Sequence, residues 1–170
     1  MSEAVIPLKS SEIDPNLKFE IAGTELGGKA FWCIQCGMCT SGCPVAEFLK
    51  PHRIVKMVML GLREQLISCK EIWLCTTCFT CSERCPQEVN PANIIFSLKN
   101  MAAKRGIIPR GLRDIGKNLA ETGRMIKISA VRERKRMKLG LPKIPQVHVE
   151  KNRKILKETS FIKTLEGAKQ

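Results

Sequence analysis

One cysteine pattern occurs twice in this chain, 42 residues apart, and it constrains the fold more than any other feature. The first copy runs from Cys33 to Pro44 and the second from Cys75 to Pro86. Each copy reads C-x2-C-x2-C-x3-C-P, a spacing that binds 4Fe–4S clusters in proteins with two such clusters. The repeat therefore predicts two 4Fe–4S clusters held by eight cysteines: Cys33, Cys36, Cys39, Cys43, Cys75, Cys78, Cys81 and Cys85.

The fourth cysteine of each run is expected to bind the cluster of the other run. Three closely spaced cysteines can reach three corners of one cube, whereas the fourth follows a longer spacer and points away. The first cluster is thus assigned to Cys33, Cys36, Cys39 and Cys85. The second is assigned to Cys75, Cys78, Cys81 and Cys43. Because these bonds would join the two halves of the fold, the apo-protein is expected to fold poorly.

Two zinc sites of four cysteines each are the alternative interpretation. Zinc sites usually pair two C-x2-C knuckles across a loop, whereas each run here places four cysteines within eleven residues and ends in Cys-Pro. The spacing therefore favours iron–sulfur. The ninth cysteine, Cys69, could be an extra ligand, a redox thiol or a buried apolar side chain, and the last is usual for a free cysteine.

Other kinds of catalytic site find little support in the sequence. There is no Gly-rich phosphate loop and no assignable Ser–His–Asp set. The only histidines are His52 and His148, and neither is expected to be a ligand; His52 is expected to face solvent. Because no apolar signal segment follows Met1 and no stretch is long enough to span a bilayer, we expect a cytoplasmic protein whose cysteines stay reduced.

The net charge of +13 belongs entirely to the C-terminal part of the chain. Residues 1–100 contain 10 basic and 10 acidic residues, whereas residues 101–170 contain 19 and 6. A basic region can dock an acidic protein, nucleic acid or anionic lipid, or it can be a solvated helical surface. We expect protein docking, because Phe161 is the only aromatic residue there and nucleic-acid binding would require more stacking residues.

A helix that starts at a proline is predicted after each cysteine run. The first begins near Pro51 and carries an apolar stripe to Leu66, and the second follows Asn90-Pro91 and ends at Gly106. Further helices are predicted over Pro109–Thr122, from a Ser129 cap to Gly140, and over about 152–165. A strand is conceivable only at Gln146–Val149.

These patterns predict an all-α protein with three parts. Residues 1–30 are expected to be an arm, because Asp14-Pro15 and three glycines interrupt any helix. Residues 31–105 are expected to form an alpha-helical ferredoxin domain, because the 31 residues between Cys43 and Cys75 favour a helix over the short strands of compact ferredoxins. Residues 106–170 are expected to be a basic helical extension for subunit docking.

Apolar side chains stand beside both cysteine runs, and we expect them to shield the clusters from water. A dry environment with few hydrogen bonds to sulfur helps to set a low reduction potential. The residues concerned are Phe31, Trp32, Ile34, Met38, Ile72, Trp73, Leu74 and Phe79.

The segment from Ile72 to Pro86, with its Trp-Leu-Cys-Thr-Thr-Cys stretch, resembles the C subunit of the heterodisulfide reductases of methanogenic archaea. The first run from Phe31 to Pro44 fits this family too, as does Leu139-Gly140-Leu141-Pro142 after a basic stretch. The resemblance covers most of residues 25–145. The cysteine runs alone are shared with iron–sulfur subunits of succinate dehydrogenase and with the C subunit of glycerol-3-phosphate dehydrogenase.

The resemblance implies an electron-transfer subunit of CoB–CoM heterodisulfide reductase, an oxidoreductase of methanogenesis. It implies two partners, the A and B subunits: A contains a flavin, and B reduces the coenzyme M–coenzyme B heterodisulfide. Electrons pass from A to B through the two 4Fe–4S clusters. A hydrogenase or formate dehydrogenase feeds the flavin, which bifurcates electrons between ferredoxin and the heterodisulfide. The alternative is the same electron-transfer role in a related complex that acts on another substrate, as in sulfur oxidation.

One departure from the family's catalytic chain concerns adjacent cysteines. That chain has Cys-Cys-Gly motifs, whereas no two cysteines are adjacent in this sequence. The resemblance therefore implies that this chain holds no catalytic residue and is inactive alone. The sequence also shows neither a fused catalytic half nor a membrane-spanning partner segment, so we expect the soluble rather than the membrane-bound form of the complex.

Overall fold

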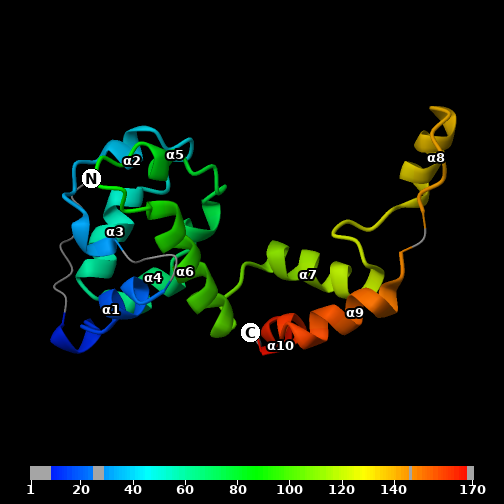
Figure 1. Cartoon of the computed structure of the whole chain (residues 1–170). Helices are drawn as coiled ribbons and strands as arrows, with labels where there is room; N and C mark the ends of the chain where they lie inside the picture. Colours follow the sequence, from blue (N-terminus) through cyan, green and yellow to red (C-terminus); the bar gives the residue numbers. More distant parts are fainter. Residues whose placement is uncertain (1–8, 25–28, 146, 168–170) are drawn as a thin grey trace. The chain divides into compact units, whose positions relative to one another are not determined.

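The computed structural model describes residues 9–24, 29–145 and 147–167, and within these ranges it contains helices but no strand. The all-α prediction is thus confirmed (Figure 1). The chain divides into two compact units, Met1–Ala102 and Ala103–Gln170. In the described ranges, no helix has the length and apolarity needed to cross a membrane.

The first unit repeats one structural motif. Each half consists of a 3-10 turn before the first cysteine, a short helix that contains the third cysteine, and a helix that starts at a proline. In the first half these are η2 (Ala30–Trp32), α2 (Met38–Ser41) and α3 (Pro51–Met59). In the second half they are η3 (Glu71–Leu74), α5 (Thr80–Glu83) and α6 (Pro91–Lys104). The cysteine repeat is therefore a repeat of structure.

The core of the first unit draws on both proline-started helices. Val55 and Val58 of α3 and Ile94 and Leu98 of α6 are fully buried, as their apolar spacing predicted. Burying side chains of this size contributes about 1.5–3 kcal/mol each. This core supports the two cysteine runs, which lead into α3 and α6.

The N-terminal segment also enters this core, which the sequence analysis did not predict. After η1 (Ser10–Glu12), helix α1 (Leu17–Ala22) packs against α3 and η2. Its Leu17 and Ile21 are fully buried. The expectation of an arm without a helix is wrong for this stretch, because Asp14-Pro15 precedes the helix rather than interrupting it.

The apolar stripe between the two cysteine runs forms two helices rather than one. Helix α3 ends at Met59, and α4 spans Arg63–Ser68. Between them Gly61 adopts a φ of +77°, and its carbonyl accepts a 2.8 Å hydrogen bond from the N–H of Asp14. The guanidinium of Arg63 pairs with Asp14 and Glu20. The predicted continuous helix is wrong because the N-terminal segment packs against the break.

The second unit contains four helices in its described part: α7 (Arg110–Thr122), α8 (Ala130–Lys138), α9 (Val149–Glu158) and α10 (Phe161–Gly167). Helices α7, α9 and α10 pack on one another. The predicted stops at Gly106 and Gly123 are confirmed, since both adopt positive φ. The predicted cap of α8 is confirmed too, because the Ser129 hydroxyl accepts a hydrogen bond from the N–H of Arg132.

Two predictions near the C-terminus differ from the structure. The single helix expected over 152–165 is two helices, separated where Ser160 adopts a φ of +58°. The possible strand at Gln146–Val149 is not formed at Val149, which begins α9. Gln146 itself lies outside the described residues.

Candidate iron–sulfur sites

Two cavities in the first unit are each lined by four cysteines. The first is lined by Cys33, Cys36, Cys39 and Cys85. The second is lined by Cys43, Cys75, Cys78 and Cys81. Their empty volumes, counted with the part open to solvent, are about 340 and 320 Å³. The structure thus brings together the same two sets of four that the sequence assigned to separate clusters.

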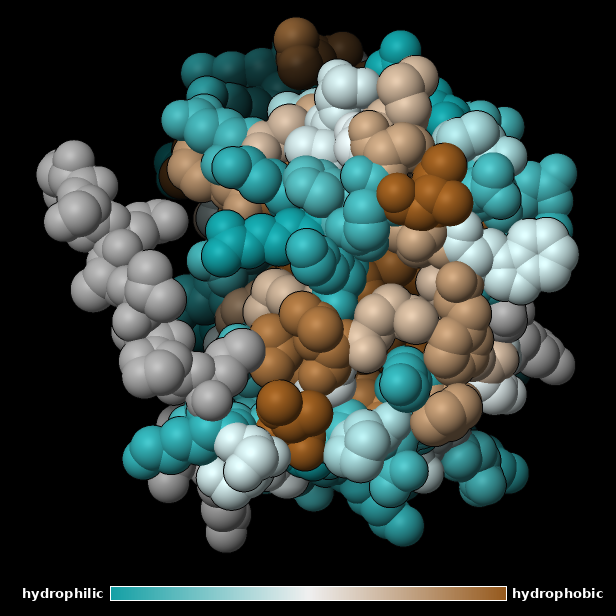
Figure 2. All heavy atoms as spheres, turned by 90° about the vertical axis from the view of Figure 1, so that its left-hand side faces the viewer, coloured by the Kyte–Doolittle hydropathy of each residue, from teal (hydrophilic) through white to brown (hydrophobic). Residues whose placement is uncertain are grey.

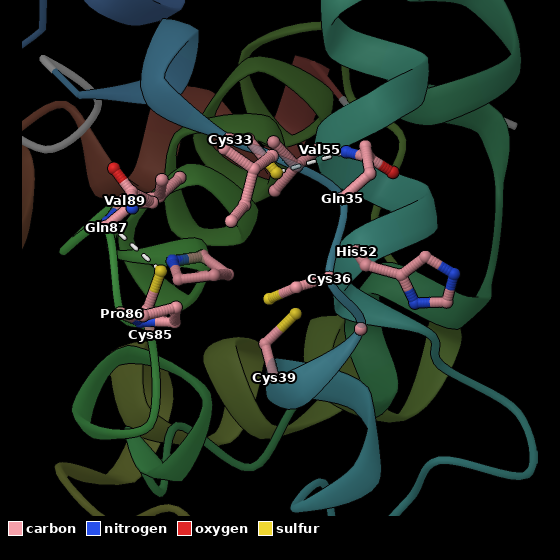
Figure 3. Close-up of a pocket in the computed structure, with 13 residues that line it drawn as sticks. Cys33, Gln35, Cys36, Cys39, His52, Val55, Cys85, Pro86, Gln87 and Val89 are labelled. Carbon is pink, nitrogen blue, oxygen red and sulfur yellow. Dashed lines mark hydrogen bonds between the residues drawn. The ribbon is translucent and has the colours of Figure 1, made fainter.

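The sulfur atoms of the first set face their cavity from three sides (Figure 3). Two N–H groups donate to them. The Nε2 of Gln35 lies 3.1 Å from the Sγ of Cys33, and the backbone N of Val89 lies 3.3 Å from the Sγ of Cys85. Lys29, just before η2, also pairs with Glu88, just after Cys85. Of these contacts, the Lys29–Glu88 pair is the one that joins the segment after Cys85 to the segment before the first run.

The same backbone turn presents the second cysteine of each run. Gln35 and Thr77, just before these cysteines, have φ values of 59° and 61°. Gly37 and Phe79, just after them, have φ values of 79° and 58°. Left-handed φ is uncommon for a residue other than glycine and costs of order 1–3 kcal/mol. The chain therefore adopts an unfavourable conformation where the turn aims cysteines into the cavities.

The proline-started helices begin between the two cavities. Pro51 lines the second cavity, whereas the next residue, His52, lines the first. In the same way Pro91 lines the first cavity and Ala92 lines the second. An oxidised 4Fe–4S cluster with four thiolates carries a charge of about −2 by formal counting. The positive ends of the α3 and α6 dipoles favour that charge.

The two cavities meet at a small buried cluster formed by Cys39, Cys81 and Ala92. Helices α2 and α5, which carry these two cysteines, pack on each other. Gly42 and Arg84, which precede the fourth cysteines, are also close, since a Cβ on Gly42 would lie 2.5 Å from an Arg84 guanidinium nitrogen. Groups bound in the two cavities would therefore be separated mainly by Cys39 and Cys81.

The cysteine thiols differ in exposure and in pKa. Burial raises the pKa of Cys39, and it raises the pKa of Cys81 to about 11. Hydrogen bonding to the Thr80 side chain lowers the pKa of Cys78. Cys36 and Cys78, at equivalent positions of the two runs, are exposed. Since iron binds thiolates, cluster binding must shift Cys39 and Cys81 to the deprotonated form.

The donor chemistry of both cavities fits a 4Fe–4S cluster. Within the described residues, no three His, Cys, Asp or Glu side chains converge as ligands of one metal ion. A 4Fe–4S cluster does not require such convergence, because each thiolate binds a different iron atom. Four thiols around each cavity, with N–H donors to two sulfurs of the first, are a suitable ligand set.

Comparison with known proteins identifies the family. A family model described as a 4Fe-4S dicluster domain matches residues 29–89. The C subunit of the H2:CoB-CoM heterodisulfide,ferredoxin reductase of Methanothermobacter thermautotrophicus is 32% identical over 153 residues, which cover 85% of this chain and 80% of the relative. The chain belongs to the C-subunit family of heterodisulfide reductases. It is a component of an oxidoreductase complex, and its cofactors are two 4Fe–4S clusters.

Further members of the C-subunit family are similar to this chain at comparable sequence identity. The second iron-sulfur C subunit of the CoB–CoM heterodisulfide reductase of Methanocaldococcus jannaschii is 34% identical over 141 residues, covering 78% of this chain and 75% of the relative. The C2 subunit of the H2/formate:CoB-CoM heterodisulfide,ferredoxin reductase of Methanococcus maripaludis is 34% identical over 108 residues, or 58% of each chain.

The structure gives defined positions to Cys69, whose role was open, and to His52, which was expected to face solvent. Cys69 is half-buried, packs against the main core and lines neither cavity. Burial raises the pKa of its thiol. His52 does not simply face solvent: it is half-buried, and its Nδ1 lies 2.6 Å from the Thr40 hydroxyl. Its ring points away from the cysteine sulfurs (Figure 3).

Six of the eight apolar neighbours that were expected to shield the clusters line neither cavity. Ile72 is buried and Trp73 packs against the core, but Trp32 is 61% exposed. Ile34 and Phe79 line the first and second cavity respectively, as shielding residues would, and both are also exposed to solvent. The remaining exposed members are Phe31, Met38 and Leu74. Apolar side chains are also visible on the face of the molecule in Figure 2.

Proposed function

We propose that this chain is the electron-transfer subunit of a CoB–CoM heterodisulfide reductase. Electrons would pass from the flavin subunit through this chain to the catalytic subunit, where the coenzyme M–coenzyme B heterodisulfide is reduced to two thiols. A hydrogenase or formate dehydrogenase would supply electrons to the flavin. The chain itself would have no catalytic residue, would be inactive alone, and would work in the cytoplasm, where its cysteines stay reduced.

One observation carries this proposal: two four-cysteine cavities meet inside the fold, and each has one exposed cysteine. Cys39 and Cys81 belong to one buried cluster at the boundary, whereas Cys36 and Cys78 are exposed. When bound there, 4Fe–4S clusters supply one-electron transfer. Because electron tunnelling weakens steeply with distance, adjoining cavities with exposed outer cysteines suit transfer between two partner proteins.

The proposed ligands follow the cavities. Cys33, Cys36, Cys39 and Cys85 would bind the first cluster. Cys75, Cys78, Cys81 and Cys43 would bind the second. The N–H groups of Gln35 and Val89 that donate to sulfur would orient two ligands of the first cluster and stabilise negative charge on them.

Cysteine-to-serine variants test this ligand assignment. Under the crossed arrangement, C85S and C33S should weaken the same electron paramagnetic resonance signal of the reduced protein, and C43S and C75S the other. Iron analysis of each variant checks that the change comes from the cluster. The ligand assignment would be refuted if C85S affected the same signal as C75S.

Reconstitution tests the electron-transfer role. The flavin and catalytic subunits mixed without this chain should fail to pass electrons from the flavin to the heterodisulfide, and the chain loaded with clusters should restore transfer. The apo-chain serves as the control and should not restore it. If the complete complex reduces another sulfur compound but not the heterodisulfide, the substrate proposal fails while the electron-transfer role stands.

A further inference from the structure

A segment of 22 residues in the second unit leaves the packed helices after α7 and returns to them before α9. It comprises residues 124–145 and is called the basic arm here. The two ends lie together: the Arg124 guanidinium donates to the carbonyl of Pro145, and a Cβ on Gly123 would lie 2.5 Å from the side chain of Val147. Helix α8, within the arm, lies apart from α7, α9 and α10 (Figure 1). The arm is therefore closed at its base and projects from the packed helices.

The arm carries much of the protein's positive charge. Its 22 residues include eight Lys or Arg and one acidic residue, Glu133. Some of the arginines stabilise the arm itself, since the Arg136 guanidinium donates to the Pro142 carbonyl at 2.9 Å. Within the described part of the chain, the side chains of Arg134, Lys135 and Lys138 form no hydrogen bond or ion pair. These three exposed cations are available to an external partner.

Apolar side chains are exposed on the same arm. Met125 and Ile126 precede α8, and Leu139, 74% exposed, follows it. Within α8, Val131 and Met137 are more than half exposed. A helix and its flanks that combine free cations with uncovered apolar side chains have the composition of a protein–protein interface.

We infer that the basic arm is a docking element that binds an acidic groove with apolar walls on another subunit of the reductase complex. This inference rests on the proposed function, which requires partner subunits on both sides of the electron path. Charge complementarity identifies the partner as acidic, because seven net positive charges within 22 residues would repel a basic surface.

The chemistry of the arm favours a protein over a membrane or a nucleic acid. Helices that lie on membranes need a broad apolar face and commonly carry Trp or Phe. The arm contains no aromatic residue, and cations occupy five of the nine positions of α8. Single-stranded nucleic acids need aromatic side chains on which bases stack. The arm supplies cations and aliphatic groups, which match a protein groove.

Charge reversal in the intact complex tests the inference. The variant R134E/K135E/K138E alters the three unpaired cations, and K151E/K154E/K157E makes the same charge change on exposed positions of α9. Binding to the flavin and catalytic subunits is measured by anaerobic interferometry with the cluster-loaded full chain. The arm variant should bind at least about tenfold more weakly, with the difference shrinking at high salt, and the α9 variant should bind nearly as the native chain does. Equal affinities of all three proteins would overturn the inference.

A second variant and a cross-linking measurement address folding and location. Because the ends of the arm meet, residues 125–144 can be replaced by a short Gly/Ser linker, which should leave both clusters and the helix content unchanged while weakening assembly. In the native complex, zero-length carbodiimide coupling should join Lys135 or Lys138 to Asp or Glu of another subunit. Arm lysines coupled to no other subunit would overturn the inference, as would arm-dependent binding confined to anionic vesicles or DNA. Absence of clusters from the native chain would instead refute the proposed function.

Discussion

Replacing Gly61 with alanine should destabilise the cluster-binding unit, because two independent constraints meet at this residue. Its φ of +77° lies in the left-handed region, which an alanine adopts only at a cost. In addition, a Cβ at this position would lie 2.3 Å from the carbonyl oxygen of Asp14 and 2.8 Å from its carbonyl carbon. Both obstacles are backbone atoms, so no side-chain rotation relieves the clash.

The expected loss of stability can be assembled from these contacts. Placing alanine in the left-handed region costs about 1–2 kcal/mol. The clash forces Asp14 away and breaks its 2.8 Å hydrogen bond to Gly61, a loss of about 1 kcal/mol. Displacing the segment that leads into buried Leu17 adds strain of about 1–3 kcal/mol. The free energy of unfolding should therefore fall by roughly 3–6 kcal/mol.

Thermal unfolding of the cluster-loaded protein measures this loss. Because cluster loss makes unfolding irreversible, variants are compared anaerobically at one scan rate, by circular dichroism and by cluster absorption. Gly61→Ala should lower the midpoint by at least roughly 10 °C. Gly140→Ala is the matched control, since its φ is +66°, nothing lies within 4 Å of the position that a Cβ would take, and the residue lines neither cysteine cavity. If both variants unfold at the same temperature, the close approach of Asp14 does not stabilise the fold.

Three further predictions concern the ligand environment and the core. Gln35→Leu removes an N–H donor to a cluster ligand and should lower the potential of the first cluster in a redox titration, whereas Gln65→Leu, at an exposed position of α4, should not. An unchanged potential for both variants would contradict the role of this donor. Cys69→Ala should retain the full iron content, because this thiol lines neither cavity, and loss of one cluster would instead make Cys69 a ligand. Leu17→Ala should cost about 2–5 kcal/mol of stability and Phe19→Ala, 60% exposed on the same helix, clearly less; similar midpoints would argue against α1 as part of the core.

Local signals in the sequence predicted much of the fold correctly. The proline starts of α3 and α6, the glycine stops at Gly106 and Gly123, and the Ser129 cap all depend on residues within a few positions of one another. Such interactions form whatever the rest of the chain does. Sequence reasoning failed where a distant segment intervened, as at Gly61, which meets Asp14 across 47 residues.

At the candidate sites, too, local features could be predicted from the sequence and contacts between distant residues could not. Cysteine spacing predicted which four thiols share each cavity, because a short spacer limits the reach of neighbouring thiols. It did not predict the N–H donor at Val89, since a backbone donor has no signature in the sequence. The apolar character of Trp32 suggested a shielding role, whereas the structure exposes this side chain. An apolar residue beside a metal site can face the interior or a partner, and only the surrounding packing decides between them.

The chemistry of this protein follows from its sequence: eight cysteines in two equal runs, each followed by a helix that starts at a proline. These features are local, and their consequences follow from bond reach and backbone geometry. Three arrangements emerge only when the chain folds: the cavities meet at Cys39, Cys81 and Ala92, α1 completes the core, and the basic arm closes at its base and projects from the packed helices of the second unit. Those arrangements depend on contacts between residues far apart in the chain, which packing selects and no short pattern encodes.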